Sequence, residues 1–305
     1  FGVQSSGTMA HSYTTSFGST LQCDYKAFDS YIKTHKGEGL ILLIDTFDTL
    51  KAGLPNAIKA FKANGIDDNY TPSYGIRLDS GDLAYLSVKC REKLDEAGLK
   101  QCKIFATNSL DEYIIPELER QGAAIDAYGV GDAIATSKHN PCFGNVYKLV
   151  QIDETPVLKR SEDKVKLINP GFQITYRIIR NGSFLADVTC LRGDKCEQTI
   201  LSKETLTIRA QFDETKVSKY DKGSYEYKAL QQMVMKNGEV IVEDSSIFEK
   251  RDYYKANLLG LNPTQRRLIN PHYYKVAVSD DLYDLKMRIL NEIVREIEET
   301  EKTNY

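Results

Sequence analysis

A repeated unit in the first half of the chain constrains its fold more than any other sequence feature. Each copy consists of a short apolar segment, an Asp or Asn, a Ser or Thr, any residue, an Asp, and then a segment with helical character. The apolar segments are residues 40–44, 74–78 and 103–107. The first polar residues are Asp45, Asp79 and Asn108, so the copies lie 79 − 45 = 34 and 108 − 79 = 29 residues apart. That period is typical of a βα unit.

A fourth strand is expected at residues 124–130, followed by Gly131 and Asp132. Four consecutive units predict an α/β fold in which residues 1–150 form a (β/α)-barrel-like layer. The polar residues at the carboxyl ends of its parallel strands would converge on one site. We therefore expect the catalytic part of the protein to lie in residues 1–150.

Residues 151–305 follow a different pattern. Asn181-Gly182 and Asn237-Gly238 are each flanked by strand-forming segments, which predicts two β-hairpins. A final helix is expected from residue 280 to about 301, and we expect its apolar stripe to pack in the core. The stripe consists of Leu282, Leu285, Ile289, Ile293 and Ile297. This second region is expected to be mainly antiparallel β-structure with helices, packed on the barrel.

The corner after residues 74–78 is the first candidate for a binding site. Arg77 and Asp79 stand at a strand end, where they can hold a polyol or a phosphate while the sheet fixes their backbone. Ser80 is a candidate N-cap of the following helix, and Asp82 complements the dipole of that helix. Ser80 and Asp82 therefore have two interpretations, as ligand contacts or as capping residues only.

Two other segments have the composition of anion sites. Residues 1–12 are rich in Gly and hydroxyl residues and include His11, which on its own is either a catalyst or a structural hydrogen-bonding residue. Gly129 and Gly131 allow a ligand phosphate to approach the backbone closely. Neither segment is specific by itself.

The composition argues against several classes of function. Lys and Arg number 40 against 43 Asp and Glu, for a net charge of −3, so no broad basic surface for nucleic acid or anionic lipid is expected. The longest apolar run, residues 40–44, is far too short to span a membrane. The six cysteines include no CxxC pair, so we expect free thiols in a cytoplasmic protein.

Taken together, these motifs resemble nicotinate phosphoribosyltransferase, a type II phosphoribosyltransferase family of NAD salvage. The segments that carry the resemblance are 7–12 (GTMAHS), 76–82 (IRLDSGD), 106–111 (ATNSLD), 128–131 (YGVG), 144–150 (GNVYKLV), 159–163 (KRSED) and 266–272 (RRLINPH). The resemblance implies an irregular (β/α)-barrel of the type II kind. It also implies that this chain lacks the N-terminal portion of the family, so that its barrel is incomplete on that side.

The activity implied by the resemblance is transfer of phosphoribosyl from phosphoribosyl pyrophosphate to nicotinate. The products are nicotinate mononucleotide and pyrophosphate, and the reaction is coupled to ATP hydrolysis through a phosphohistidine. The implied partners are nicotinate, phosphoribosyl pyrophosphate, ATP and a second copy of the chain in a homodimer. Mg²⁺ is expected to be carried by pyrophosphate or ATP, and no metal site made by the protein alone is expected.

The resemblance also implies residue roles. His11 would be the phosphorylated residue, Arg77 would pair with the nicotinate carboxylate or a phosphate, and Asp79 would accept hydrogen bonds from the ribose hydroxyls. The other implied substrate-binding residues are Thr8, Ser80, Gly81, Asn108, Ser109, Gly129, Gly131 and Asp132. Asp45 and Asp48 are expected to cap helices or to support the site from behind.

Rival interpretations remain at this point. Within the family, a nicotinamide-using enzyme would have Pro where this chain has Leu78, and a quinolinate-using enzyme would need more cations at its strand ends. An aldolase-type barrel would need a lysine inside a strand, whereas Lys103 is placed at a strand start. From another class, the alternative is a non-catalytic fragment that binds phosphoribosyl compounds or self-associates without turnover.

Overall fold

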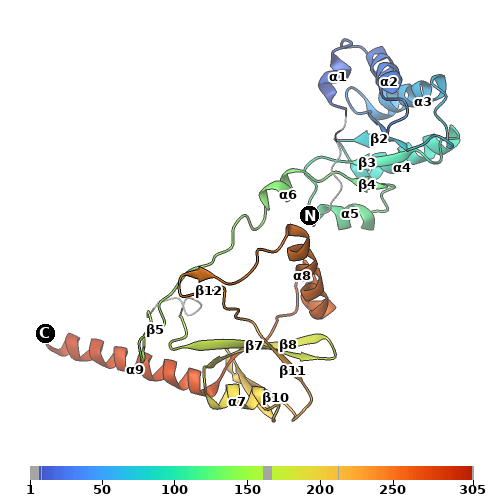
Figure 1. Cartoon of the computed structure of the whole chain (residues 1–305). Coiled ribbons are helices and arrows are strands. Elements are labelled where there is room, and N and C mark those ends of the chain that lie inside the picture. Colours follow the sequence, from blue (N-terminus) through green and yellow to red (C-terminus); the bar gives the residue numbers. More distant parts are fainter. Residues whose placement is uncertain (1–6, 8, 161–166, 212, 304–305) are drawn as a thin grey trace. The chain divides into compact units, whose positions relative to one another are not determined.

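The computed structural model describes residues 7, 9–160, 167–211 and 213–303 of the chain. The chain divides into two compact units between Gly144 and Asn145 (Figure 1). Each unit has its own sheet and its own apolar core.

The N-terminal unit contains a four-stranded parallel sheet whose strands follow one another in sequence order. The strands are β1 (Leu40–Leu43), β2 (Tyr74–Leu78), β3 (Lys103–Ala106) and β4 (Ala127–Tyr128). This arrangement confirms the α/β class and the repeated βα unit. Among the described residues β1 and β4 each pair with one neighbour only, so these strands form an open sheet and the barrel expectation is not confirmed.

Strand β4 is shorter than the sequence predicts, because a side chain takes over part of the ladder beside it. The carboxylate of Asp126 accepts a hydrogen bond from the backbone N–H of Ile104 at 2.8 Å. The same carboxylate also accepts a hydrogen bond from Lys103 Nζ at 3.2 Å. Regular pairing therefore begins only at Ala127.

Helices cover the sheet of the N-terminal unit (Figure 1). The helices of this unit are α1 (His11–Thr15), α2 (Gln22–His35), the π-helix η1 (Thr49–Gly53), α3 (Leu54–Ala63), α4 (Leu83–Glu96), α5 (Ile114–Arg120) and α6 (Asp132–Thr136). Helix α4 contacts β2 and β3, while α2 contacts β1 and α3. The core between these elements is fully buried at Phe28, Phe61, Leu42, Ile76 and Ile104. Burial of such side chains is the main favourable term in the stability of this unit.

Two helix starts differ from the sequence prediction. Helix α4 is capped by Asp82, whose carboxylate accepts from the backbone N–H of Tyr85 at 3.0 Å, so the expectation of Ser80 as N-cap is wrong. The sequence predicts a helix over residues 110–121, whereas helix α5 begins at Ile114. The carboxylate of Asp111 holds the preceding residues in a turn, because it accepts from the N–H groups of Tyr113 and Ile114.

The π-helix η1 follows β1 at a close approach that only glycine permits. A Cβ atom on Gly53 would lie 1.7 Å from the carbonyl oxygen of Ile44. Asp48 caps the start of η1 by accepting from the N–H of Lys51 at 2.8 Å, as expected for this residue. The corner that begins at Asp45 is thereby held between β1 and η1.

The C-terminal unit contains a six-stranded sheet in the order β10-β9-β14-β8-β7-β11. Its strands are β7 (Gln173–Arg180), β8 (Ser183–Leu191), β9 (Leu206–Ala210), β10 (Asp213–Tyr220), β11 (Glu226–Ala229) and β14 (Val276–Val278). All pairs are antiparallel except β14 with β8. The β7–β8 hairpin turns at Asn181 and Gly182, which confirms the first predicted hairpin.

Shorter elements complete this unit. The two-residue strands are β5 (Gln151–Ile152), β6 (Thr155–Pro156), β12 (Met235–Lys236) and β13 (Glu239–Val240), and β12 and β13 form the second predicted hairpin around Asn237 and Gly238. The helices are α7 (Lys195–Leu201), α8 (Ile247–Gly260), the 3₁₀ helix η3 (Pro263–Arg266) and α9 (Asp280–Thr303).

The apolar stripe of α9 is only partly a core feature. Leu282 is fully buried, whereas Ile297 is 39% exposed. Leu285, Ile289 and Ile293 are partly buried, so the expectation that the whole stripe packs in the core is wrong. The helix contacts β8 and α7.

Two expectations from composition can be checked directly. All six cysteines are free thiols, as predicted. Among the described helices, none combines the length and the apolar character that crossing a bilayer requires.

Candidate functional site

The corners after β1 and β2 are joined by one buried carboxylate. The side chain of Asp45 is only 1% exposed, and its Oδ2 accepts hydrogen bonds from the backbone N–H of Asp79 at 2.9 Å and from the hydroxyl of Ser80 at 2.6 Å. Asp45 therefore supports the site from behind and caps no helix. Ser80, which the sequence suggested as a cap or a ligand contact, uses its hydroxyl to bind this carboxylate.

His11 begins α1 and lies against both corners. Its Nδ1 is 3.1 Å from the hydroxyl of Thr46, and its Nε2 is 3.9 Å from Asp45 Oδ1 and 3.7 Å from Asp79 Oδ2. Asp45 Oδ1 is buried and has no hydrogen-bond donor among the described residues. Two carboxylates therefore lie beside one imidazole, and both are on the side of Nε2. The ring is 42% exposed and remains accessible to a ligand.

Arg77 lies at the end of β2, where its guanidinium contacts Asp79, Thr107 and Met9. Nη2 lies 2.8 Å from Asp79 Oδ1, Nε donates to the hydroxyl of Thr107 at 2.8 Å, and Nη1 donates to the carbonyl of Met9 at 3.0 Å. The hydroxyl of Thr107 in turn donates to Asp79 Oδ1. The guanidinium thus links the segment before α1 to the ends of β2 and β3.

This network sets the charge of Asp79. Partial burial pushes the pKa of its carboxyl upward, but hydrogen bonds from Thr107 and Arg77, together with the nearby His11, outweigh burial and hold that pKa below its usual value. Asp79 is therefore an anion across the neutral pH range. Its Oδ1 is occupied by Arg77 and Thr107, while its Oδ2 faces His11.

The other predicted ligand residues follow β2, β3 and β4, at the carboxyl ends of these parallel strands. Asn108 and Ser109 follow β3 with φ angles of 85° and 51°, which are left-handed values that non-glycine residues adopt rarely and that occur often at binding sites. The remaining residues are exposed: Gly81 after β2, Gly129 and Gly131 after β4, and Asp132 at the start of α6. Thr8, also predicted to contact substrate, lies outside the described residues.

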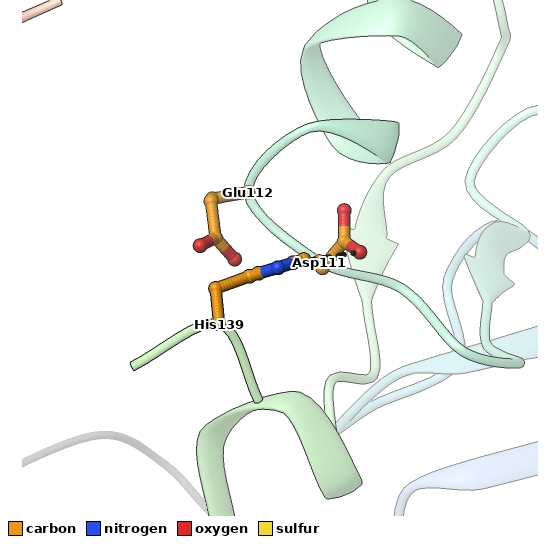
Figure 2. A group of neighbouring side chains, drawn as sticks. All are labelled: Asp111, Glu112 and His139. Carbon is orange, nitrogen blue, oxygen red and sulfur yellow. Dashed lines mark ion pairs between the residues drawn. The ribbon is translucent and has the colours of Figure 1, made fainter. Parts of the chain in front are cut away.

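A second polar cluster joins the loop after β3 to the segment after α6 (Figure 2). It consists of Asp111, Glu112 and His139, whose ligand atoms lie within 4.8 Å of one another. Asp111 is 7% exposed, and its Oδ2 lies 3.5 Å from His139 Nε2 and 3.9 Å from Lys138 Nζ. Hydrogen bonds from the backbone of Ile114 and Tyr113, together with His139 and Lys138, lower the pKa of Asp111. Although the cluster has the donor types of a divalent metal site, the ammonium of Lys138 lies 3.9 Å from its buried carboxylate, so we interpret it as a link between two loops.

Sequence reasoning missed three contributors to the site: Thr46, Thr107 and the carbonyl of Met9. Thr46 occupies the hydroxyl position of the repeated unit, so the repeat itself contained a signal for it. For Thr107 the sequence pattern indicates only the end of a strand. Its role becomes visible only when β2 and β3 are placed side by side, with Leu78 opposite Ala106.

The sequence of the chain is similar to those of known proteins over both units. A sequence profile of the nicotinate phosphoribosyltransferase C-terminal domain matches residues 172–286. Over 306 aligned residues the chain is 35% identical to the nicotinate phosphoribosyltransferase of Bacillus subtilis, and the match covers 98% of this chain and 59% of that protein. The chain belongs to the nicotinate phosphoribosyltransferase family. The family enzyme of Dictyostelium discoideum is 30% identical over 291 residues, with 90% of this chain and 48% of that protein covered. The chain thus spans about half to three fifths of the length of these relatives.

A solved structure of the family agrees in fold. The crystal structure of human nicotinic acid phosphoribosyltransferase matches with a TM-score of 0.65 and 21% sequence identity. The match covers 95% of this chain and 62% of the human chain. At this identity the likeness concerns the fold alone.

Proposed function

We propose that this chain carries the phosphoribosyl-transfer site of a nicotinate phosphoribosyltransferase in NAD salvage. The reaction replaces pyrophosphate, at the anomeric carbon of phosphoribosyl pyrophosphate, with the pyridine nitrogen of nicotinate. The observation that carries the proposal is the convergence of His11, Arg77 and Asp79 at one sheet edge in a member of this family.

The charges of the cluster suit this chemistry. As the bond to pyrophosphate breaks, the ribose gains positive character, which a fixed anion stabilises. Asp79 Oδ2 is the carboxylate oxygen available for this role and for a ribose hydroxyl, because Oδ1 is held by Arg77 and Thr107. Arg77 supplies positive charge to the nicotinate carboxylate or to a substrate phosphate, and Asn108, Ser109, Gly131 and Asp132 are proposed to line the 5′-phosphate end.

His11 is proposed to accept a phosphoryl group from ATP during turnover. Thr46 fixes one ring nitrogen, and Asp45 and Asp79 lie beside the other, so the ring orientation is set before any ligand binds. The two carboxylates stabilise the positive charge that the ring acquires on phosphorylation. Mg²⁺ is proposed to travel with ATP and pyrophosphate.

We extend the proposal to the assembly. The four parallel strands are proposed to belong to an irregular (β/α)-barrel, and the protein to act as a homodimer. Large apolar side chains exposed next to the division between the units, such as Phe143 and Tyr147, would be covered by such an assembly.

The test is the formation of nicotinate mononucleotide from nicotinate and phosphoribosyl pyrophosphate, with and without ATP, and with nicotinamide as the control substrate. We expect product from nicotinate only, at a rate that rises with ATP. His11→Ala should lose the ATP stimulation and keep basal transfer. His35→Ala, which changes a half-buried histidine at the end of α2, should behave as the unaltered chain. Arg77→Ala should nearly abolish transfer.

Three results would contradict the proposal. Unchanged transfer in Arg77→Ala would exclude its role in holding an anion. A folded chain that binds phosphoribosyl pyrophosphate in calorimetry but forms no product would be the non-catalytic binding protein, and a folded chain that does neither would overturn the proposed function altogether.

A further inference from the structure

The hydroxyl of Thr107 stands between the two charged groups of the site. It accepts a hydrogen bond from Arg77 Nε at 2.8 Å and donates one to Asp79 Oδ1. A threonine hydroxyl has one proton to donate and two lone pairs that accept. Because Arg77 can only donate and ionised Asp79 can only accept, the hydroxyl must accept from Arg77 and donate to Asp79. The carbonyl of Leu78, at 3.4 Å, is the competing acceptor, and the charged carboxylate is the stronger of the two.

The methyl group of Thr107 is fixed from the opposite side. A Cβ atom on Gly129 would lie 2.6 Å from Thr107 Cγ2, so glycine at this position leaves the space that the methyl group occupies. The next atoms that this Cβ would meet are 3.8 and 3.9 Å away, which are ordinary contact distances. The backbone of Thr107 is held as well, because its N–H donates to the carbonyl of Leu78 at 2.9 Å. The hydroxyl and the methyl group of Thr107 are therefore both held in place, which fixes its side chain in one rotamer.

We propose that Thr107 is a positioning residue that holds Arg77 and Asp79 in the geometry needed for the phosphoribosyl substrate, and that Gly129 acts by leaving room for the Thr107 methyl group. This inference rests on the proposed function, since it assigns Arg77 and Asp79 to that substrate. It changes the role of Gly129, which the sequence suggested as a phosphate contact, to that of a support for Thr107.

The electrostatics agree with this role. The hydrogen bond from Thr107 lowers the pKa of Asp79, so loss of the hydroxyl removes a stabilising contact from the ionised carboxylate. The pKa of Asp79 should then move upward, and the acidic limb of any activity that needs ionised Asp79 should move to higher pH.

The experiment compares two nearly isosteric variants in nicotinate mononucleotide formation. Thr107→Val keeps the methyl group and loses the hydroxyl, whereas Thr107→Ser does the reverse. We expect kcat/KM for phosphoribosyl pyrophosphate to fall about 10- to 100-fold in Thr107→Val, which is the range for loss of a charge-assisted hydrogen bond, and to stay within about threefold in Thr107→Ser. The acidic limb should shift upward only in Thr107→Val. Equal losses in the two variants, or no loss in Thr107→Val, would overturn the proposal.

The contact with Gly129 gives an independent test through compensation. Gly129→Ala introduces a methyl group that collides with the Thr107 methyl group, so it should reduce kcat/KM in the same way as Thr107→Val. The double variant Thr107→Ser/Gly129→Ala removes the colliding methyl group and should recover most of the loss. If the double variant is as impaired as Gly129→Ala alone, the glycine serves the ligand directly and this part of the proposal is wrong.

A third readout separates this inference from the proposed function. The carboxyl ¹³C resonance of Asp79 can be titrated by NMR in the unaltered chain, in Thr107→Val and in Thr107→Ser, with circular dichroism to confirm folding. The positioning role is supported if the pKa of Asp79 shifts upward in Thr107→Val and does not shift in Thr107→Ser. This result would support it even if the chain forms no nicotinate mononucleotide. Absence of both turnover and substrate binding in the unaltered chain would count against the proposed function, and an unshifted Asp79 in Thr107→Val would count against Thr107.

Discussion

At the residue scale, the least expected group is a carboxyl outside the site. Asp24 lies in the first turn of α2, is fully buried, and has no hydrogen-bond partner for either oxygen among the described residues. Burial raises its pKa from 3.8 to about 6. The folded state therefore binds the proton more tightly than the unfolded state does. Ionised Asp24 destabilises the fold above pH 6, and this effect disappears as the pH falls toward 4.

We predict that Asp24→Asn stabilises the chain at pH 8, because the variant removes the buried charge. The upper limit follows from the pKa difference of 6 − 3.8 = 2.2 and is about 3 kcal/mol. Urea unfolding followed by circular dichroism between pH 4 and 8 measures it, and the gain should vanish near pH 4. The control is Asp29→Asn on the same helix: hydrogen bonds from Lys33 and Asn64 lower the pKa of Asp29, so this variant should instead lose stability at neutral pH. A gain in Asp24→Asn that does not depend on pH would contradict the explanation.

At the element scale, helix starts and the π-helix fix the corners that carry the site. Asp82 caps α4 and Asp48 caps η1, while Gly53 lets η1 approach the end of β1. Asp45 lies between β1 and η1, and Asp79 lies between β2 and α4. The backbone of each residue is therefore held by a strand on one side and by a capped helix on the other. A rigid support of this kind is what an arrangement of charges needs to act on a ligand without rearrangement.

We predict that Asp82→Ala lowers the free energy of unfolding by about 1 kcal/mol, because it removes the acceptor for the N–H of Tyr85. Asp82→Asn keeps a side-chain oxygen and should lose much less. Denaturant unfolding at neutral pH compares the two variants. If Asp82→Ala has the stability of the unaltered chain, the cap contributes nothing and another group must satisfy the start of α4.

At the scale of the whole molecule, the chain has two separate cores. One is built around β1, β2 and β3, and includes Ile76. The other is built on the six-stranded sheet, and includes Ile178. Both isoleucines are fully buried, so each contributes to the stability of its own unit.

We predict that Ile76→Ala and Ile178→Ala destabilise different halves of the chain. Truncation of a buried isoleucine typically costs about 2–5 kcal/mol. Limited proteolysis with mass spectrometry should show the first new cleavages within residues 3–144 for Ile76→Ala and within residues 145–305 for Ile178→Ala. New cleavages throughout the chain in both variants would mean that the two units unfold as one.

The sequence by itself determined the features that depend on neighbouring residues. Strands of the βα units, the turn at Asn181 and Gly182, the free thiols and the placement of Arg77 and Asp79 at a strand end all follow from local periodicity, turn chemistry and composition. These patterns span a few residues, so they can be read without knowing what packs against what. The motif order also indicated the family, which the comparisons then showed.

Only the tertiary structure decided which distant groups meet. Asp45 reaches the backbone of Asp79, Thr107 reaches Arg77, and His11 reaches Thr46, across 34, 30 and 35 residues of chain respectively. Those contacts depend on the register between strands and on the path of each corner, which no local pattern encodes. For the same reason the sequence assigned the cap of α4 to Ser80 and placed the whole stripe of α9 in the core. Both Ser80 and Asp82 are residue types that cap helices, so the sequence does not decide which of them caps α4. An amphipathic stripe such as that of α9 indicates an apolar face but not how much of this face is buried.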